Sequence, residues 1–134
     1  MDLTPEQAAD DAADAHRLIL AGRVLNTPVY NHDGERIGHI DDLSIERETG
    51  QTRYAILSFG GFLGIGEKFH PLPWQVLRFD PTRGGFVVPL DKAALADAPH
   101  YDRAELARLG GESHRIYSEA ILEYYGRYGV APYF

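Results

Sequence analysis

Apolar and polar residues follow two different periods along the chain. Up to about residue 90, apolar side chains come in short runs, and Gly, Pro, Asn and Asp separate these runs. Such runs predict β-strands, which we expect at residues 24–30, 36–46, 54–59, 68–72, 77–80 and 86–88. Six short strands joined by turns are typical of a small closed barrel or a sandwich, so the predicted fold class is mainly β.

The turns between these strands lead to more specific predictions. Asp33-Gly34 is expected to form a type I′ hairpin turn, because Asp-Gly supplies the positive φ angles that this turn requires. Residues 80–84, Asp-Pro-Thr-Arg-Gly, predict the turn of the last hairpin. Pro71 and Pro73 are expected to end the ladder pairing of the fourth strand, because proline has no N–H to donate.

The predicted strand 36–46 contains an irregularity. Its apolar positions Ile40 and Leu43 break strict alternation by one residue, which predicts a β-bulge near Asp41-Asp42. A helix is the competing interpretation of this spacing. Gly38 and the turns on both sides argue against a helix.

After residue 90 the period becomes helical. One or two helical turns are expected at residues 91–96, ending before Pro99. A capping box of Asp102 and Glu105 predicts a second short helix that ends at Gly110-Gly111. A third helix is expected from residue 113 to about residue 125.

The third helix carries an aromatic stripe that must be buried somewhere. Its members recur at helical spacing and are Tyr117, Ile121, Tyr124 and Tyr128, widened by Ile116 and Ala120. Because Gly110-Gly111 is a pliable joint and tyrosine is enriched at interfaces, we expect this helix to pack on a second copy of the chain, giving a homodimer. The alternative is a helix docked on its own barrel.

The pattern divides the chain into three parts. Residues 1–20 read as an acidic, alanine-rich arm, either helical or disordered. Residues 21–95 contain the predicted strands and form the expected barrel domain. Residues 96–134 form a C-terminal helical extension.

Composition excludes several classes of protein. The 134 residues contain no cysteine, which removes thiol nucleophiles, disulfides and the usual zinc frameworks. The net charge of -7 argues against direct binding of nucleic acid, which depends on clustered Lys and Arg. No signal peptide is evident, and no apolar run approaches the ~20 residues of a membrane span. We therefore expect a cytoplasmic protein.

A glycine-rich loop lies between the third and fourth predicted strands. Residues 60–66 interleave four glycines with the large apolar residues Phe62, Leu63 and Ile65. A flexible linker would combine glycine with serine rather than with such residues. The three side chains either plug one end of the barrel or form a protein-interaction contact, and the sequence leaves both open.

The sequence offers few candidates for catalysis or metal binding. His39 and Asp41 share one face of a strand, but a metal site needs three or four ligands, and the other histidines are scattered. Asp41 and Asp42 point to opposite faces, so an ionic or bulge-stabilising role is expected. Ser58 has no nucleophile-elbow pattern, and the glycine loop lacks the Lys-Ser/Thr end of a phosphate loop. We expect no catalytic, cofactor or metal residues, and no enzyme.

Together these turns resemble one known family, the PRC-barrel domain. The residues that carry the resemblance are Gly22-Arg23-Val24, residues 28–31, 33–38, 42–43, 49–50 and 54–58, and the whole of residues 60–74. The resemblance implies a small six-stranded β-barrel, as in the H subunit of the photosynthetic reaction centre and the C-terminal domain of the ribosome maturation factor RimM. We expect neither the transmembrane helix of the former nor the N-terminal domain of the latter before this barrel.

The resemblance also implies a function. PRC-barrel proteins act as binding and assembly modules, so a non-enzymatic protein-interaction module is expected, homo-oligomeric and with a further protein partner. The alternatives are an accessory factor in RNA processing or ribosome assembly, and an accessory protein of a photosynthetic electron-transfer complex. Both rest on likeness of fold alone.

Overall fold

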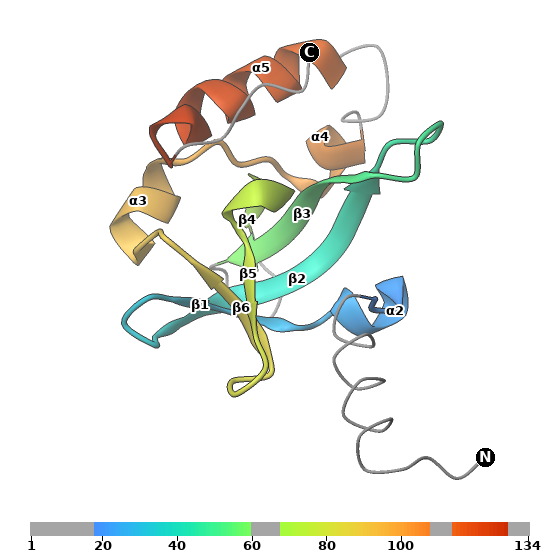
Figure 1. Ribbon diagram of the computed structural model, residues 1–134. Helices are drawn as coiled ribbons and strands as arrows, with labels where there is room; N and C mark the ends of the chain where they lie inside the picture. The colour runs from blue at the N-terminus through green and yellow to red at the C-terminus, as the bar shows by residue number, and fades with distance from the viewer. Residues whose placement is uncertain (1–17, 60–67, 108–113, 129–134) are drawn as a thin grey trace, which may run out of the picture.

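The computed structural model describes residues 18–59, 68–107 and 114–128, with side chains from Glu119 onward in the last range (Figure 1). A curled sheet forms the body of the molecule, and three helices follow it in the chain. The elements are α2 (Ala21–Val24), β1 (Pro28–Asn31), β2 (Arg36–Ile45), β3 (Thr52–Phe59), β4 (Lys68–Pro73), the 3-10 helix η1 (Trp74–Val76), β5 (Arg78–Asp80), β6 (Gly85–Val88), α3 (Lys92–Asp97), α4 (Arg103–Leu106), α5 (His114–Tyr125) and the 3-10 helix η3 (Gly126–Tyr128).

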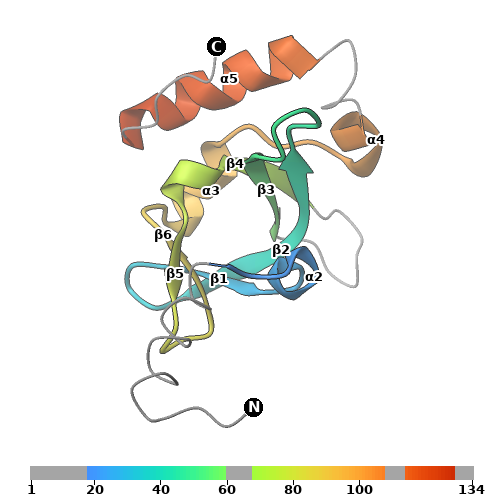
Figure 2. The same ribbon diagram turned by 45° about the vertical axis from the view of Figure 1, so that its right-hand side comes forward.

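The six strands form one sheet in the order β4-β3-β2-β1-β6-β5. All neighbours are antiparallel except β1 and β6, which run parallel. The sheet curls strongly (Figure 2), and the chain passes from β4 to β5 through η1. No ladder joins β4 to β5 within the described ranges, so the expected closed barrel is wrong in this respect: hydrogen bonds do not close the sheet.

An isolated β-bridge between Phe69 and Tyr101 explains why β4 does not pair with β5. Tyr101, beyond the last strand, exchanges two backbone hydrogen bonds with Phe69 of β4, at 3.1 and 2.9 Å. That contact occupies part of the outer edge of β4. Further along the same strand, Pro71 and Pro73 have no N–H to offer a second neighbour.

One of the two prolines behaves differently from the prediction. Pro71 pairs with Ile56 inside the ladder with β3, so it does not end the pairing, whereas Pro73, opposite Tyr54, forms the last pair. Because β4 is the last strand of the sheet, it needs hydrogen-bonding groups on one side only, and proline is tolerated on such an edge.

The first predicted strand is shorter than expected. Residues 21–24 form the short helix α2, whose Val24 is buried, and β1 begins only at Pro28. Asn26, at φ 66°, turns the chain between them, and its N–H donates to the carbonyl of Ile40 at 2.6 Å. A buried valine fits either element, so the apolar pattern alone did not distinguish them.

The first hairpin turn also differs from the prediction. Gly34 has φ 86°, but Asp33 does not have a positive φ, so the turn is not type I′. The N–H of Gly34 donates to the carbonyl of Asn31 at 3.0 Å, and Asn31 and Glu35 continue the ladder. This is a three-residue loop ended by a left-handed glycine, the next commonest hairpin connection.

Other local predictions are confirmed. The register of β2 against β3 shifts between Ile40 and Asp42, which is the expected bulge, and Asp42 Oδ1 accepts a hydrogen bond from the N–H of Leu43 at 2.8 Å. Asp102 and Glu105 form the capping box of α4. The cap of α3 was not predicted: the Asp91 side chain accepts a hydrogen bond from the N–H of Ala94 at 2.7 Å.

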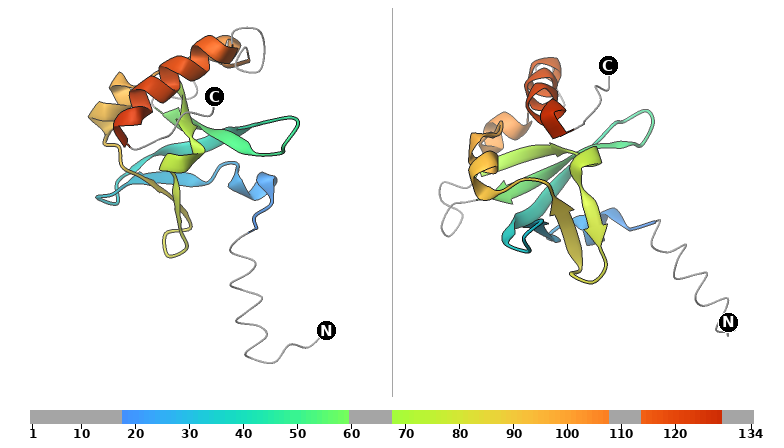
Figure 3. Two further views of the ribbon diagram at one scale, coloured as in Figure 1. Left: turned by 45° about the horizontal axis from the view of Figure 1, so that its top comes forward. Right: turned by 60° about the vertical axis from the view of Figure 1, so that its left-hand side comes forward.

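The buried core continues from the sheet into the C-terminal helices. α5 lies across β4, and the views in Figure 3 place it on the outside of the curled sheet. The buried apolar residues from the helical part are Leu95, Ala98, Tyr101, Ile121, Leu122 and Tyr125. The extension is therefore part of the same core as the strands.

The buried face of α5 is not the stripe that the spacing predicted. Ile121 and Tyr125 are fully buried and Leu122 nearly so, whereas Tyr124 and Tyr128 are half-buried and Ala120 is exposed. The helix therefore docks on its own chain, as in the alternative arrangement, and Ile121 is not free to meet a partner. The Tyr124 hydroxyl donates to the carbonyl of Ala94 in α3 at 2.6 Å, which fixes the rotation of the helix.

Candidate interaction surface at strand β5

Strand β5 is the open edge of the sheet. The opposite end strand, β4, is buried along most of its length and is bridged by Tyr101. By contrast, Arg78 and Phe79 of β5 are both exposed, although successive side chains of a strand point to opposite faces. Among the described residues, β5 pairs only with β6. An uncovered end strand offers free backbone N–H and C=O groups to another chain.

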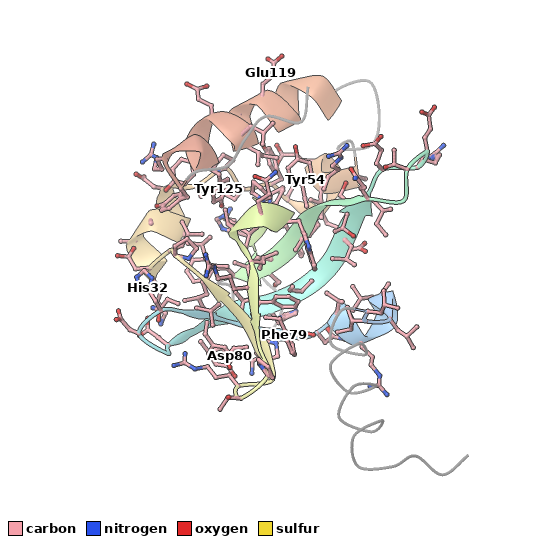
Figure 4. All side chains as sticks on the ribbon, in the orientation of Figure 1. His32, Tyr54, Phe79, Asp80, Glu119 and Tyr125 are labelled. Carbon is pink, nitrogen blue, oxygen red and sulfur yellow. The ribbon has the colours of Figure 1, made fainter. Side chains whose placement is uncertain are left out.

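Phe79 is the main apolar group on this edge. Its side chain is 46% exposed, and it lies opposite Phe86 of β6 with ring centroids 5.4 Å apart. Phe86 in turn meets Trp74 of η1 at 5.6 Å, edge to face. Trp74 is half-buried and packs against the hydrophobic core. Figure 4 shows Phe79 near the middle of the molecule, close to the turn that carries Asp80.

A groove lies beside β5, on the face that carries Arg78. It has a volume of about 390 Å³ and is here called the β5 groove. Its floor includes the apolar side chains of Val76 and of Val87, which stands opposite Arg78 in the ladder. The lining residues come from η1, β5, β6 and the residue after it, the β1–β2 turn and η3, and are His32, Gln75, Val76, Arg78, Val87, Val88, Pro89 and Tyr128.

The turn that carries His32 is held by a buried asparagine. Asn31 is 3% exposed, and its Oδ1 accepts hydrogen bonds from the N–H groups of Asp33 at 3.0 Å and Glu35 at 2.9 Å. These bonds fix a turn whose residues His32 and Asp33 are exposed; Figure 4 labels His32 on this turn. The backbone of this turn therefore sets the position of His32 in the lining of the groove.

The groove differs in charge from the rest of the chain. None of its lining residues is acidic, whereas the whole chain has 20 Asp and Glu against 13 Lys and Arg. Within the described part of the chain, Arg78 forms no ion pair, in contrast to Arg53, Arg83, Lys92 and Arg103. The groove thus presents one uncompensated cation above an apolar floor.

The neighbouring acidic side chains are already engaged, with one exception. Asp80, two residues after Arg78, pairs with Arg83 at 3.5 Å and accepts from the N–H of Thr82. Glu35 pairs with Lys92 at 3.8 Å. Asp33 is exposed beside His32 but does not line the groove.

The structure separates the residues that the sequence singled out for interaction. Phe62, Leu63 and Ile65 lie outside the described residues, as does the side chain of Tyr117. Ile121 is in the core and Tyr124 holds α5 against α3, whereas Tyr128 lines the β5 groove. Of the expected set, Tyr128 is the one that the structure brings to this surface.

The metal and acid–base candidates have structural roles. Asp41 pairs with Arg103 of α4 at 3.5 Å, and Asp42 holds the bulge, as its hydrogen bond to Leu43 shows. In the ranges that the structure describes, no three His, Asp or Glu side chains gather in a way that could hold a metal ion. Nor is any helix in those ranges long and apolar enough to cross a membrane.

A buried histidine is the main titratable group that sequence reasoning missed. His70 of β4 is 1% exposed, and its ring lies 5.8 Å from that of Phe59 and 5.4 Å from that of His100. Burial, reinforced by the charge of His100, lowers the pKa of His70 from 6.5 to about 4, although the carbonyl of Pro99 acts in the opposite direction and Lys68 adds a small repulsion. The signal in the sequence was a polar residue inside the apolar run 69–72.

This burial predicts a loss of stability in acid. The unfolded chain protonates His70 near pH 6.5 and the folded chain only near pH 4, so the unfolded state binds more protons between these values. The contribution is fully present above pH 6.5 and is lost as the pH falls toward 4, by an amount on the order of 3 kcal/mol.

The measurement is urea unfolding at pH 7.5, 6, 5 and 4, for wild type and His70→Leu. As the pH falls, the unfolding free energy of wild type should decrease more than that of His70→Leu, so the variant should become more stable relative to wild type. If this difference is the same at pH 7.5 and pH 4, His70 is not the group responsible. A His100→Gln variant, which removes the repelling neighbour, should reduce the pH dependence.

A family model described as the PRC-barrel domain matches residues 17–95. The chain belongs to the PRC-barrel family. The match covers more than half of the 134 residues and includes all six strands of this PRC-barrel, α2 and η1. No curated protein matches the chain. A PRC-barrel domain suggests a protein-interaction module.

Proposed function

We propose that this PRC-barrel protein is a non-enzymatic interaction module that forms a homodimer through strand β5. The single observation that carries the proposal is the asymmetry of the two sheet ends. β4 is buried and bridged by Tyr101, whereas β5 is exposed on both faces and carries Phe79. An exposed end strand is the part of a sheet to which another chain can add a strand, so β5, although only three residues long, is a natural site for strand pairing.

A two-fold axis through β5 gives the simplest closed arrangement. Two copies of an antiparallel end strand can pair with each other so that each Phe79 meets the other copy's edge, and no further open edge remains at that site. Such pairing joins the two sheets through backbone hydrogen bonds. It leaves Arg78 and the β5 groove on the opposite face of the strand from Phe79.

The test is a matched pair of substitutions. Phe79 and Ile45 are both apolar, both lie on strands and are 46% and 50% exposed, so Phe79→Asp and Ile45→Asp make the same chemical change at comparable exposure. Phe79→Asp is expected to weaken dimerisation by about 10-fold or more, because two aspartates would face each other across the axis. Ile45→Asp should leave it unchanged.

Sedimentation equilibrium over a range of protein concentrations measures both dissociation constants. Circular dichroism of each variant establishes that it has folded. Equal dissociation constants of the two variants would show that β5 is not part of the interface. Any self-association would then use another surface.

A further inference from the structure

The β5 groove and the N-terminal segment have complementary charge. Residues 1–17 contain five acidic side chains, Asp2, Glu6, Asp10, Asp11 and Asp14, against one arginine, a balance of -4 out of the -7 of the whole chain. The groove is lined by His32 and by Arg78, which forms no ion pair with any residue that the structure describes, and it has no acidic lining residue. We propose that the β5 groove binds the chain's own acidic N-terminal segment, residues 1–17.

The apolar residues of the β5 groove and of the N-terminal segment also match. The floor of the groove is formed by Val76, Val87 and Val88, and Pro89 and Tyr128 complete its apolar part. The segment alternates its acids with Leu3, Pro5 and several alanines, which are small enough to approach such a floor closely. A carboxylate beside the guanidinium of Arg78 forms a charge-assisted hydrogen bond, about twice as strong as a neutral one.

The segment is long enough to reach the groove of its own chain. The described structure begins at Leu18, just before α2. Seventeen residues span up to about 55 Å when extended, and the radius of gyration of a domain of this size is only about 13 Å. A tethered ligand of this length has an effective concentration in the millimolar range, so even a weak contact is largely formed within one molecule.

For function, this means that the N-terminal segment fills the β5 groove when no other ligand is bound. An external acidic peptide must displace the segment before it can bind, so the segment sets the threshold for access to the groove. This inference does not depend on dimerisation through β5, because Phe79 and Arg78 lie on opposite faces of the strand.

The test uses full-length protein and one defined peptide. In the segment-neutral protein, the four aspartates of residues 1–17 are replaced by asparagine and Glu6 by glutamine. The ligand is a synthetic peptide of residues 1–17. Binding is followed by the fluorescence of Trp74, the only tryptophan of the chain, which precedes the lining residues Gln75 and Val76.

The segment-neutral protein is expected to bind the peptide at least about tenfold more tightly than wild type, in which the tethered copy competes. Adding Arg78→Gln to the segment-neutral protein should weaken binding at least about tenfold. The matched control is Arg47→Gln, which removes the same charge from the exposed β2–β3 turn and should have no effect. Raising the salt concentration should weaken binding, as expected for a charged contact.

Three results would overturn the proposal. One is equal peptide affinity of wild type and the segment-neutral protein, and another is unchanged affinity after Arg78→Gln. The third is a loss of dimer mass on neutralising the segment, which would place the segment of one copy in the groove of another. A failed dimerisation test with intact peptide binding would contradict only the proposed function.

Discussion

Replacing Tyr125 with alanine is expected to lower the free energy of unfolding by about 4 kcal/mol. The side chain is fully buried between α5 and the sheet, and its ring lies 5.1 Å from that of Tyr124 and 6.1 Å from that of Tyr128. Figure 4 shows Tyr125 on the side of α5 that faces the domain, whereas Glu119 points outward. Truncation would leave a large cavity under the helix, which the surrounding side chains cannot fill.

The control for this prediction is Tyr125→Phe. The Tyr125 hydroxyl is buried without a hydrogen-bond partner among the described residues, and burial strongly raises its pKa. Removing it should leave stability unchanged or raise it by up to about 1 kcal/mol. Urea unfolding measures both variants. If Tyr125→Ala unfolds at the wild-type urea concentration, α5 does not belong to the core of its own chain.

Replacing Gly38 with alanine is expected to cost about 3 kcal/mol of stability. A Cβ atom at this position of β2 would overlap the carbonyl oxygen of Ser58 in β3 and lie 2.9 Å from Leu57 Cδ1. Ser58 belongs to the ladder with β2, so the backbone cannot move away without breaking hydrogen bonds between the two strands. Glycine is required here by the close approach of two strands, not by an unusual φ angle.

Gly22→Ala is the matched control for Gly38→Ala. Gly22 lies in α2, and a Cβ atom there meets nothing within 4 Å. Because alanine favours helix, this variant should be at least as stable as wild type. Thermal unfolding of the two variants side by side makes the comparison. Equal melting temperatures would contradict the tight contact between β2 and β3.

The features that depend on neighbouring residues were predictable from the sequence. The bulge at Asp41-Asp42 follows from a break in alternation, and the capping box of α4 follows from Asp102 and Glu105, three residues apart. The family resemblance and the six strands likewise depend on turn residues at fixed spacing. Each of these signals is complete within a few residues of the chain.

The features that depend on distant contacts were not predictable in the same way. The rotation of α5 is set by the Tyr124 hydroxyl and the carbonyl of Ala94, 30 residues away. The open sheet follows from the bridge between Phe69 and Tyr101, which no local pattern shows. By helical spacing, two adjacent faces of α5 are almost equally apolar. In the folded chain, the face with Leu122 and Tyr125 is the one that is buried.

For the same reason, most of the candidate interaction surface at β5 could not be predicted from the sequence. Arg78 is one charged residue in a short strand, and only the fold places it opposite Val87 and near His32 and Tyr128. Of these, Tyr128 was expected to take part in an interaction, although as a member of a helical stripe. The exposure of Phe79 follows from its place on the last strand of the sheet, which strand order alone decides.

The central claim is that this PRC-barrel protein associates with itself. The most direct test is to measure the mass of the untagged wild-type protein by sedimentation velocity and, independently, by multi-angle light scattering. The protein concentration is tens of micromolar, and the salt concentration is physiological. We expect a species of twice the chain mass of 14.9 kDa, which dissociates on dilution. A single species of 14.9 kDa at every concentration would contradict it.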